Sequence, residues 1–209
     1  MKNIANEKKL KTMVIFTEPH AKEFFAESSN SSSQPSRISP WRDKFQRLKA
    51  QGVDFAFYLN FNKKLQSMTP EKFINNVLGN LNIHYLTIGD DFKFGNRRKG
   101  DYEMLENWGS LNDVIVQQTP TYLRGDRRYS SSWIREALDK DDFELAAELL
   151  GRRYTFSGKV VSGNSLGRTI GVPTANLWLP KSNLPIKGVY AVKVHYEKEI
   201  LLGIANMGI

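Results

Sequence analysis

The sequence predicts an α/β protein with two parts: a Rossmann-like domain built on a parallel sheet, then an antiparallel β-barrel or sandwich. Up to Gly151, short runs of apolar and β-branched residues alternate with amphipathic helical segments, a pattern typical of a parallel sheet covered on both faces. After Gly151 the helical period disappears, and short strands are separated by Gly, Pro and Asn. We therefore predict a domain boundary near residue 151, which gives domains 1–151 and 152–209.

Strands and helices are predicted to alternate along the first domain. Four strands are predicted at residues 12–20, 53–59, 84–92 and 113–118, and five helices at residues 41–52, 69–79, 101–109, 129–138 and 141–151. The Ser-rich residues 26–40 are predicted to form a mobile loop. Thr69 before Pro70, Ser130 or Ser131, and Asp141 or Asp142 have the chemistry of N-caps. In the second domain, strands are predicted at residues 155–161, 174–179, 188–195 and 200–205.

The composition limits the chemistry. The 209 residues contain no cysteine, which excludes disulfides, thiolate nucleophiles and thiolate metal sites. We find neither a signal peptide nor an apolar run long enough to span a membrane, so we expect a cytoplasmic protein without a membrane partner. The formal net charge of +8 favours anionic partners, but the basic residues are scattered in short clusters rather than gathered on one helix. The sequence assigns no oligomeric state.

Three motifs in fixed order carry a family resemblance. They are "IGDDFKFGNRRKGD" at residues 88–101, "YSSSWIREAL" at 129–138 and "GRTIGVPTANL" at 167–177. In this order they resemble the GDDFxFGxxRxGD, ISSTxIR and GRxxGxPTAN motifs of the bacterial bifunctional riboflavin kinase/FAD synthetases, and "TEPH" at 17–20 resembles that family's FEPHP loop. Chance matches at independent positions multiply, so the combination is specific.

The resemblance implies two ATP-dependent activities. The first domain would be an FMN adenylyltransferase (FAD synthetase) of the nucleotidylyltransferase type, which joins AMP to FMN and releases pyrophosphate. The second would be the N-terminal part of a riboflavin kinase β-barrel, which moves the γ-phosphate of ATP to riboflavin. The substrates and products are thus ATP, riboflavin, FMN and FAD, with Mg²⁺ as the metal, and no nucleic acid is expected. Both reactions depend on positioning phosphates and neutralising their charge rather than on a protein nucleophile.

The resemblance also assigns residues to the adenylyltransferase site. The positions assigned to flavin binding are His20, Asp90, Asp91, Phe92, Phe94, Gly95 and Arg98. The positions assigned to the ATP phosphates are Ser130, Ser131, Ser132 and Arg135, where the amides of a helix N-terminus would add to the side chains. A serine cap on an ordinary surface helix is the alternative reading of this second group.

In the kinase part, the resemblance assigns Gly163, Gly167, Arg168 and Gly171 to nucleotide binding. Thr174 and Asn176 complete that set and would also supply oxygen ligands to Mg²⁺. Two positions apart on a predicted strand, they would face the same side.

Two stretches that the family carries have no counterpart here. The GxFDGxHxGH stretch of the first strand is absent before Met13, and the family's kinase glutamate lies in a region beyond "GIANMG". No catalytic residue is therefore assigned. We expect a fragment with an incomplete barrel, with impaired activity and, without the first strand of its sheet, a tendency to aggregate.

Two other functions are open at this point. The chain could be a non-catalytic remnant that binds flavin or nucleotide without turnover. It could also be a basic RNA- or single-stranded-DNA-binding protein, with Trp133, Tyr154 and Trp178 as stacking side chains.

Overall fold

The computed structural model describes residues 1–29, 36–162, 174–179 and 183–208. The chain divides into two compact units. Unit 1 comprises Met1–Gln34 and Lys49–Tyr129, and unit 2 comprises Pro35–Leu48 and Ser130–Ile209. Part of the segment between two strands of unit 1, Pro35–Leu48, therefore belongs to unit 2, which sequence order did not indicate.

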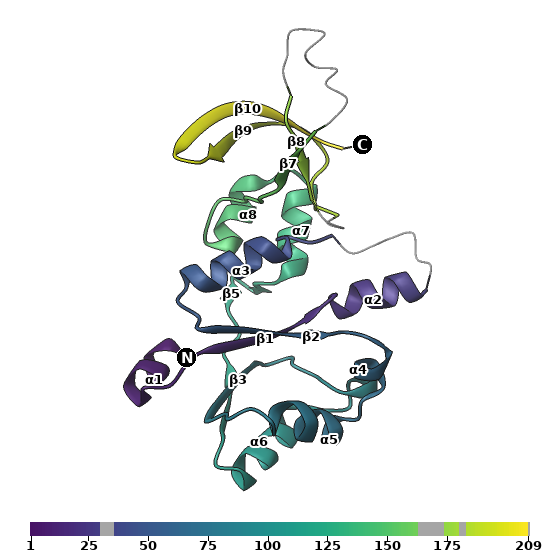
Figure 1. The fold of residues 1–209 in the computed structure, drawn as a ribbon, viewed down its shortest axis with the longest axis vertical. Helices are drawn as coiled ribbons and strands as arrows, with labels where there is room; N and C mark the ends of the chain where they lie inside the picture. The colour runs from purple at the N-terminus through teal and green to yellow at the C-terminus, as the bar shows by residue number, and fades with distance from the viewer. Residues whose placement is uncertain (30–35, 163–173, 180–182, 209) are drawn as a thin grey trace. The chain divides into compact units, whose positions relative to one another are not determined.

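Unit 1 is built on parallel strand pairs (Figure 1). Its elements are α1 (Lys2–Lys8), β1 (Met13–Glu18), α2 (Ala21–Ser28), β2 (Phe55–Asn60), α4 (Lys63–Ser67), α5 (Pro70–Phe73), the π-helix η1 (Ile74–Leu78), β3 (Tyr85–Gly89), the 3₁₀ helix η2 (Asn96–Arg98), α6 (Tyr102–Leu111), β4 (Ile115–Thr119), β5 (Leu123–Arg124) and β6 (Arg127–Arg128). β1 pairs with β2 in parallel from Met13↔Phe55 onward, and β3 pairs with β4 in parallel from Tyr85↔Ile115 onward. The predicted parallel pairing is confirmed.

The arrangement of these pairs differs from the prediction in two ways. The described strands form separate two-stranded sheets, β1–β2 and β3–β4, rather than one continuous sheet. In addition, β2 is not covered on both faces, since Phe55 is 56% and Tyr58 64% exposed. Periodicity identifies a strand but not its neighbours, which lie tens of residues away in the sequence.

The core of unit 1 joins helix, strand and loop. Its buried members are Ile74, Leu78, Ile88, Phe94 and Leu105. They come from η1, β3, the loop after β3, and α6, and Figure 1 shows α5 and α6 beside β3. Thr69 accepts a hydrogen bond from the Lys72 amide and caps α5, as predicted, and Pro70 occupies the first turn. The loop predicted for residues 26–40 is wrong at its start, because α2 extends to Ser28.

Unit 2 contains helices and antiparallel strands. Its elements are α3 (Trp41–Ala50), α7 (Ser131–Asp139), α8 (Phe143–Leu150), β7 (Lys159–Val161), β8 (Asn176–Trp178), β9 (Gly188–Tyr196) and β10 (Glu199–Met207). Ser130 caps α7 and Asp142 caps α8, which decides between the predicted alternatives. β7 pairs with β8 and β9 with β10, both antiparallel, and these described strands form two pairs rather than a closed barrel.

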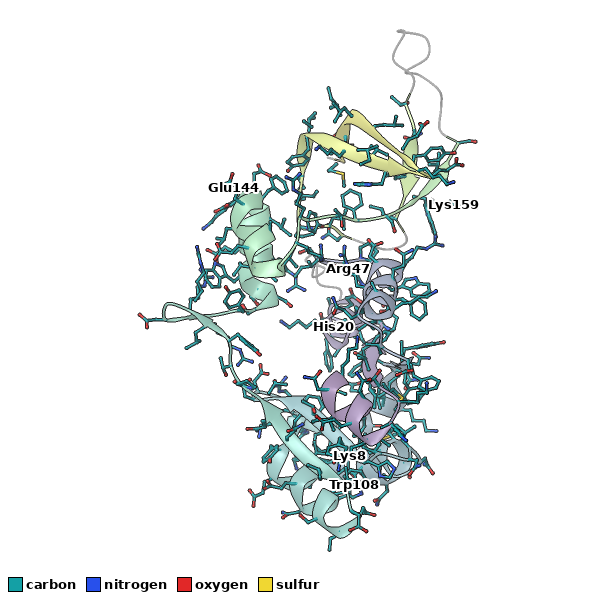
Figure 2. The ribbon with its side chains drawn as sticks, turned by 90° about the vertical axis from the view of Figure 1, so that its left-hand side faces the viewer. Lys8, His20, Arg47, Trp108, Glu144 and Lys159 are labelled. Carbon is teal, nitrogen blue, oxygen red and sulfur yellow. The ribbon has the colours of Figure 1, made fainter. Side chains whose placement is uncertain are left out.

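Most of α3 is held in unit 2 by polar contacts. Asp43 is only 5% exposed, and its carboxylate accepts hydrogen bonds from the Ser157 amide at 2.9 Å and from the Ser157 hydroxyl. The Arg47 guanidinium (Figure 2) donates to the Thr155 carbonyl oxygen at 3.2 Å and to its Oγ1 at 2.9 Å. The two hydrogen bonds from Ser157 satisfy the Asp43 carboxylate, whose burial would otherwise be costly.

Thr12 and Asp54, the residues that precede β1 and β2, are joined by hydrogen bonds. The Asp54 carboxylate accepts hydrogen bonds from the Thr12 amide at 2.9 Å and the Thr12 hydroxyl at 2.8 Å, and Lys11 Nζ lies 3.1 Å away. The Asp54 amide donates back to Thr12 Oγ1 at 3.0 Å. The backbone and side-chain hydrogen bonds from Thr12, with a smaller contribution from Lys11, lower the pKa of Asp54 to about 2.

We predict an acid-sensitive contribution of Asp54 to stability. Its pKa is lowered by folding, so the contribution is present above the ordinary value of 3.8 and is lost as the pH falls toward 2. Urea unfolding of the wild type between pH 2 and pH 5, compared with Asp54→Asn and Thr12→Val, measures this. Both variants should show a flatter pH dependence in this range, and an unchanged slope in Asp54→Asn would contradict the assignment.

Candidate functional site

The loop at the carboxyl end of β3 places two aspartates in different surroundings. Asp90 accepts hydrogen bonds from the Thr121 hydroxyl and from Arg128 Nη2, which lies 2.5 Å from Asp90 Oδ1. Among the described residues, Asp91 has a longer contact with the same guanidinium, at 3.4 Å. The side chain of Asp90 is 30% exposed and that of Asp91 76%. Ligands of parallel α/β sheets bind at such strand ends.

The surroundings of Asp90 favour its charged form. The hydrogen bond from Thr121 is the largest cause that lowers the pKa of Asp90, and the Arg128 guanidinium lowers it further, while partial burial opposes both. Asp90 is thus a carboxylate throughout the neutral range.

The two phenylalanines of the loop have different positions. Phe94 is 6% exposed and belongs to the core, and its amide and carbonyl both pair with Gly100. Phe92 is 37% exposed and stacks on Phe94, with ring centroids 5.8 Å apart and planes at 20°. Of the two rings, Phe92 is the one that can also contact a planar ligand.

The second half of the loop is tightly constrained. Gly95 has φ +70°, and a Cβ at this position would lie 2.7 Å from the Pro70 nitrogen. Arg97 and Arg98 also have left-handed backbone conformations, at φ 54° and 57°, which are strained for residues with a side chain. Asp101 caps α6 through the Met104 amide and accepts a hydrogen bond from Lys93 at 3.2 Å. Arg98 is exposed at the rim of this loop.

His20 lies just beyond the carboxyl end of β1. It is exposed (Figure 2), and its Nδ1 accepts a hydrogen bond from the Lys22 amide at 3.2 Å. Together with Glu23 it forms a capping box at the start of α2. His20 therefore has a structural role at the helix start beside the binding role that the resemblance assigns to it.

An aromatic cluster that the sequence did not indicate lies near the same strand ends. Phe24 and Phe25 of α2 contact Phe61, which follows β2, with ring centroids 5.3–5.8 Å apart in edge-to-face geometry. Phe25 is 46% exposed. The three rings were missed because Phe61 is far from α2 in the sequence.

In unit 2, the start of α7 carries the serines of the second motif. The Ser130 oxygen accepts a hydrogen bond from the Trp133 amide at 3.2 Å, so this residue is a helix cap, whereas Ser131 and Ser132 are exposed in the first turn. Arg135 Nε donates to the Ser36 carbonyl at 2.7 Å. The serine hydroxyls and the first-turn amides of α7 form a surface with the donors that phosphate requires.

The kinase motif is only partly described. Gly163, Gly167, Arg168 and Gly171 lie outside the described residues. Asn176 begins β8, opposite Val161, and Thr174 precedes the strand rather than lying on it as predicted. Both side chains are exposed and offer oxygen atoms, the element through which proteins bind Mg²⁺.

The surroundings of three aromatic residues bear on nucleic-acid binding. Trp133 is 7% exposed, and the Tyr154 hydroxyl is buried, which raises the pKa of Tyr154 to about 12. Trp178, at 56% exposed, is accessible for stacking. Two of the three proposed stacking side chains thus serve packing instead.

Comparison with known proteins decides the family. A model of the FAD synthetase family matches residues 1–133, and a riboflavin kinase model matches residues 150–209. The chain belongs to the FAD synthetase family. The matched ranges include the Asp90 loop in the first case and Thr174 and Asn176 in the second.

Curated members of the FAD synthetase family are similar over nearly the whole chain. A bifunctional riboflavin kinase/FMN adenylyltransferase of Haemophilus influenzae is 41% identical over 98% of this chain and 66% of its own length. One of Escherichia coli is 38% identical over 97% of this chain and 64% of its own length. The chain thus spans about two thirds of these relatives.

A solved structure has the same fold. It is described as a macrolide-efflux protein from Streptococcus pneumoniae, and it matches with a TM-score of 0.77 and 27% identity, covering 98% of this chain and 66% of the other. In the part of this chain that the structure describes, no helix has both the length and the apolar character to cross a membrane.

We predict that Gly95 tolerates no side chain. Gly95→Ala should destabilise the protein by about 3 kcal/mol or more, because it combines left-handed strain with a clash against the Pro70 backbone. Gly125→Ala is the matched control: φ is +58° there, but apart from the glycine and its chain neighbours no described atom lies within 4 Å of the added Cβ, so only about 1–2 kcal/mol is expected. Urea unfolding measures both, and equal losses would show that the Pro70 contact is unimportant.

Proposed function

We propose that this chain acts in flavin-nucleotide biosynthesis, with ATP-dependent phosphorylation of riboflavin to FMN and adenylylation of FMN to FAD. The observation that carries the proposal is the anchored Asp90–Asp91 loop, at a parallel strand end within the range that matches the FAD synthetase family. The bifunctional relatives support the pairing of the two activities. We assign residues 1–151 to the adenylyltransferase and 152–209 to the N-terminal part of the kinase, in the cytoplasm.

In the adenylyltransferase, the flavin meets the loop after β3. Phe92 offers a partly exposed ring and Asp91 a largely exposed carboxylate, which suit an aromatic ligand that carries hydrogen-bond donors. An oxygen of the FMN phosphate attacks the α-phosphorus of ATP, and pyrophosphate leaves. Taken by itself, unit 2 offers Ser131, Ser132 and the first-turn amides of α7 as donors, which we assign to the phosphate oxygens of ATP.

In the kinase part, the ribityl hydroxyl of riboflavin attacks the γ-phosphorus of ATP, and ADP leaves. Thr174 and Asn176 would hold Mg²⁺, which neutralises phosphate charge when bound. No group of three or more His, Asp or Glu side chains at metal-binding spacing occurs among the described residues, and two neutral oxygens bind Mg²⁺ weakly by themselves. We therefore expect the metal to arrive with the nucleotide phosphates.

Two measurements on the purified chain test the function. Flavin fluorescence quenching reports binding, and chromatography reports FMN formed from riboflavin, or FAD formed from FMN, with Mg-ATP. Turnover supports the proposal. Binding without turnover supports a non-catalytic flavin-binding remnant. The absence of flavin and nucleotide binding overturns both the proposed enzyme and the remnant. If oligonucleotide binding that weakens steeply with salt is found instead, the chain is a nucleic-acid-binding protein.

We predict that Asp91→Asn weakens FMN binding about tenfold, equivalent to about 1.4 kcal/mol, because it removes a charged hydrogen-bond acceptor. Asp126→Asn, which removes an exposed carboxylate from the turn of the β5–β6 hairpin, is the control and should bind FMN like the wild type. The assignment is wrong if both variants bind FMN equally.

We predict that Asn176→Ala weakens ATP binding about tenfold in the presence of Mg²⁺ and leaves metal-free ATP binding unchanged, because the amide oxygen acts through the metal. The control is Asn206→Ala, which removes an exposed amide side chain from β10. Isothermal titration with and without Mg²⁺ measures both. An equal loss in the two conditions would mean that Asn176 contacts the nucleotide itself.

A further inference from the structure

The two aspartates after β3 share a motif but not a set of contacts. Both carboxylate oxygens of Asp90 are in use: Oδ2 accepts from the Thr121 hydroxyl, and Oδ1 accepts from Arg128 at 2.5 Å. Within the described part of the chain, the contact of Asp91 is made by Oδ1, at 3.4 Å from the same guanidinium, and the side chain is 76% exposed. A ligand would have to displace existing bonds to reach Asp90, but not to reach Asp91.

The partners of Asp90 come from the segment that follows β4. Thr121 lies just after that strand, and Arg128 lies on β6 of the short β5–β6 hairpin. The Tyr129 amide donates to the Tyr122 carbonyl at 3.0 Å, which closes the base of the hairpin. Asp90 is thus the point at which the hairpin is fastened to the end of β3.

The local charge indicates which part of a ligand Asp91 can meet. Asp90, Asp91 and Arg128 together carry one net negative charge, and Arg128 already faces Asp90 at 2.5 Å. A phosphate would be repelled by the exposed Asp91 carboxylate, whereas a hydroxyl or ring N–H would donate to it. Asp91 therefore suits the uncharged, hydrogen-bond-donating part of a ligand.

From these contacts we infer that Asp90, Thr121 and Arg128 form a positioning clamp, and that Asp91 alone of the two aspartates contacts the ligand. Arg128 and Thr121 act through Asp90 and do not touch the flavin. They hold the β3 loop so that Asp91 meets the N–H or hydroxyl groups of the flavin rather than its phosphate. The ligand part of this inference rests on the proposed function, but the clamp does not.

Hydrogen exchange tests the clamp without any ligand. In the full chain, Arg128→Gln and Asp90→Asn should each speed amide exchange in residues 89–95 by about tenfold, because each breaks the same anchor. The double variant should exchange no faster than either single variant. Arg128→Lys, which keeps the positive charge but not the planar guanidinium, should lie between the wild type and Arg128→Gln. Asp91→Asn should exchange like the wild type.

Flavin fluorescence quenching tests the division of roles. Arg128→Gln and Asp90→Asn should each raise the Kd for FMN about fivefold, and the double variant should raise this Kd no further. Asp91→Asn should raise the Kd for FMN without altering the amide exchange of residues 89–95. Independent, multiplying losses in the double variant would overturn the clamp, and so would faster loop exchange in Asp91→Asn.

The two proposals fail in different ways. If the wild type binds no flavin, the proposed function fails, and the exchange data alone decide the clamp. If Arg128→Gln is poorly folded by circular dichroism, Thr121→Val replaces it, since it removes one hydroxyl donor and keeps the charge. Exchange in Thr121→Val equal to that of the wild type would then contradict the clamp.

Discussion

Burial of Phe94 holds the candidate site to the core of unit 1. Phe94 is 6% exposed, and its ring packs with Phe73 and Phe92. Its amide and its carbonyl both form hydrogen bonds with Gly100. Full burial of such a ring stabilises a fold by roughly 1.5–3 kcal/mol. Because Phe94 lies only a few residues after Asp90 and Asp91, the same packing that stabilises the domain also fixes where those carboxylates lie.

The site is therefore supported from two directions. From the core side, Phe94 and the close approach of Gly95 to Pro70 fix the far end of the loop. From the solvent side, Arg128 and Thr121 hold the near end through Asp90. A loop held at both ends loses little entropy when a ligand binds, which is the advantage of a preorganised site.

Unit 2 includes most of α3, although α3 lies between β1 and β2 in the sequence. Most of α3, which connects β1 to β2, belongs to unit 2, where the buried Asp43 accepts two hydrogen bonds from Ser157. A helix that joins two parallel strands normally covers their own sheet. The Asp43 carboxylate, buried on the helix face that meets Ser157, gives a physical reason for the different location of α3.

The sequence by itself determined the strands β1 to β4, the helices α3, α6, α7 and α8, and the family motifs, but not α1, α2, α4 or the β5–β6 hairpin. Thr69 was recognisable as a cap, and Ser130 and Asp142 each as one of two candidates, because each binds an amide three residues on, so the interaction is local. Tertiary structure alone decided the sheet pairing, the place of α3 and the anchoring of Asp90. Thr121 and Arg128 lie 31 and 38 residues after Asp90, and no local pattern records a contact that the chain makes only when β3 and β4 pair.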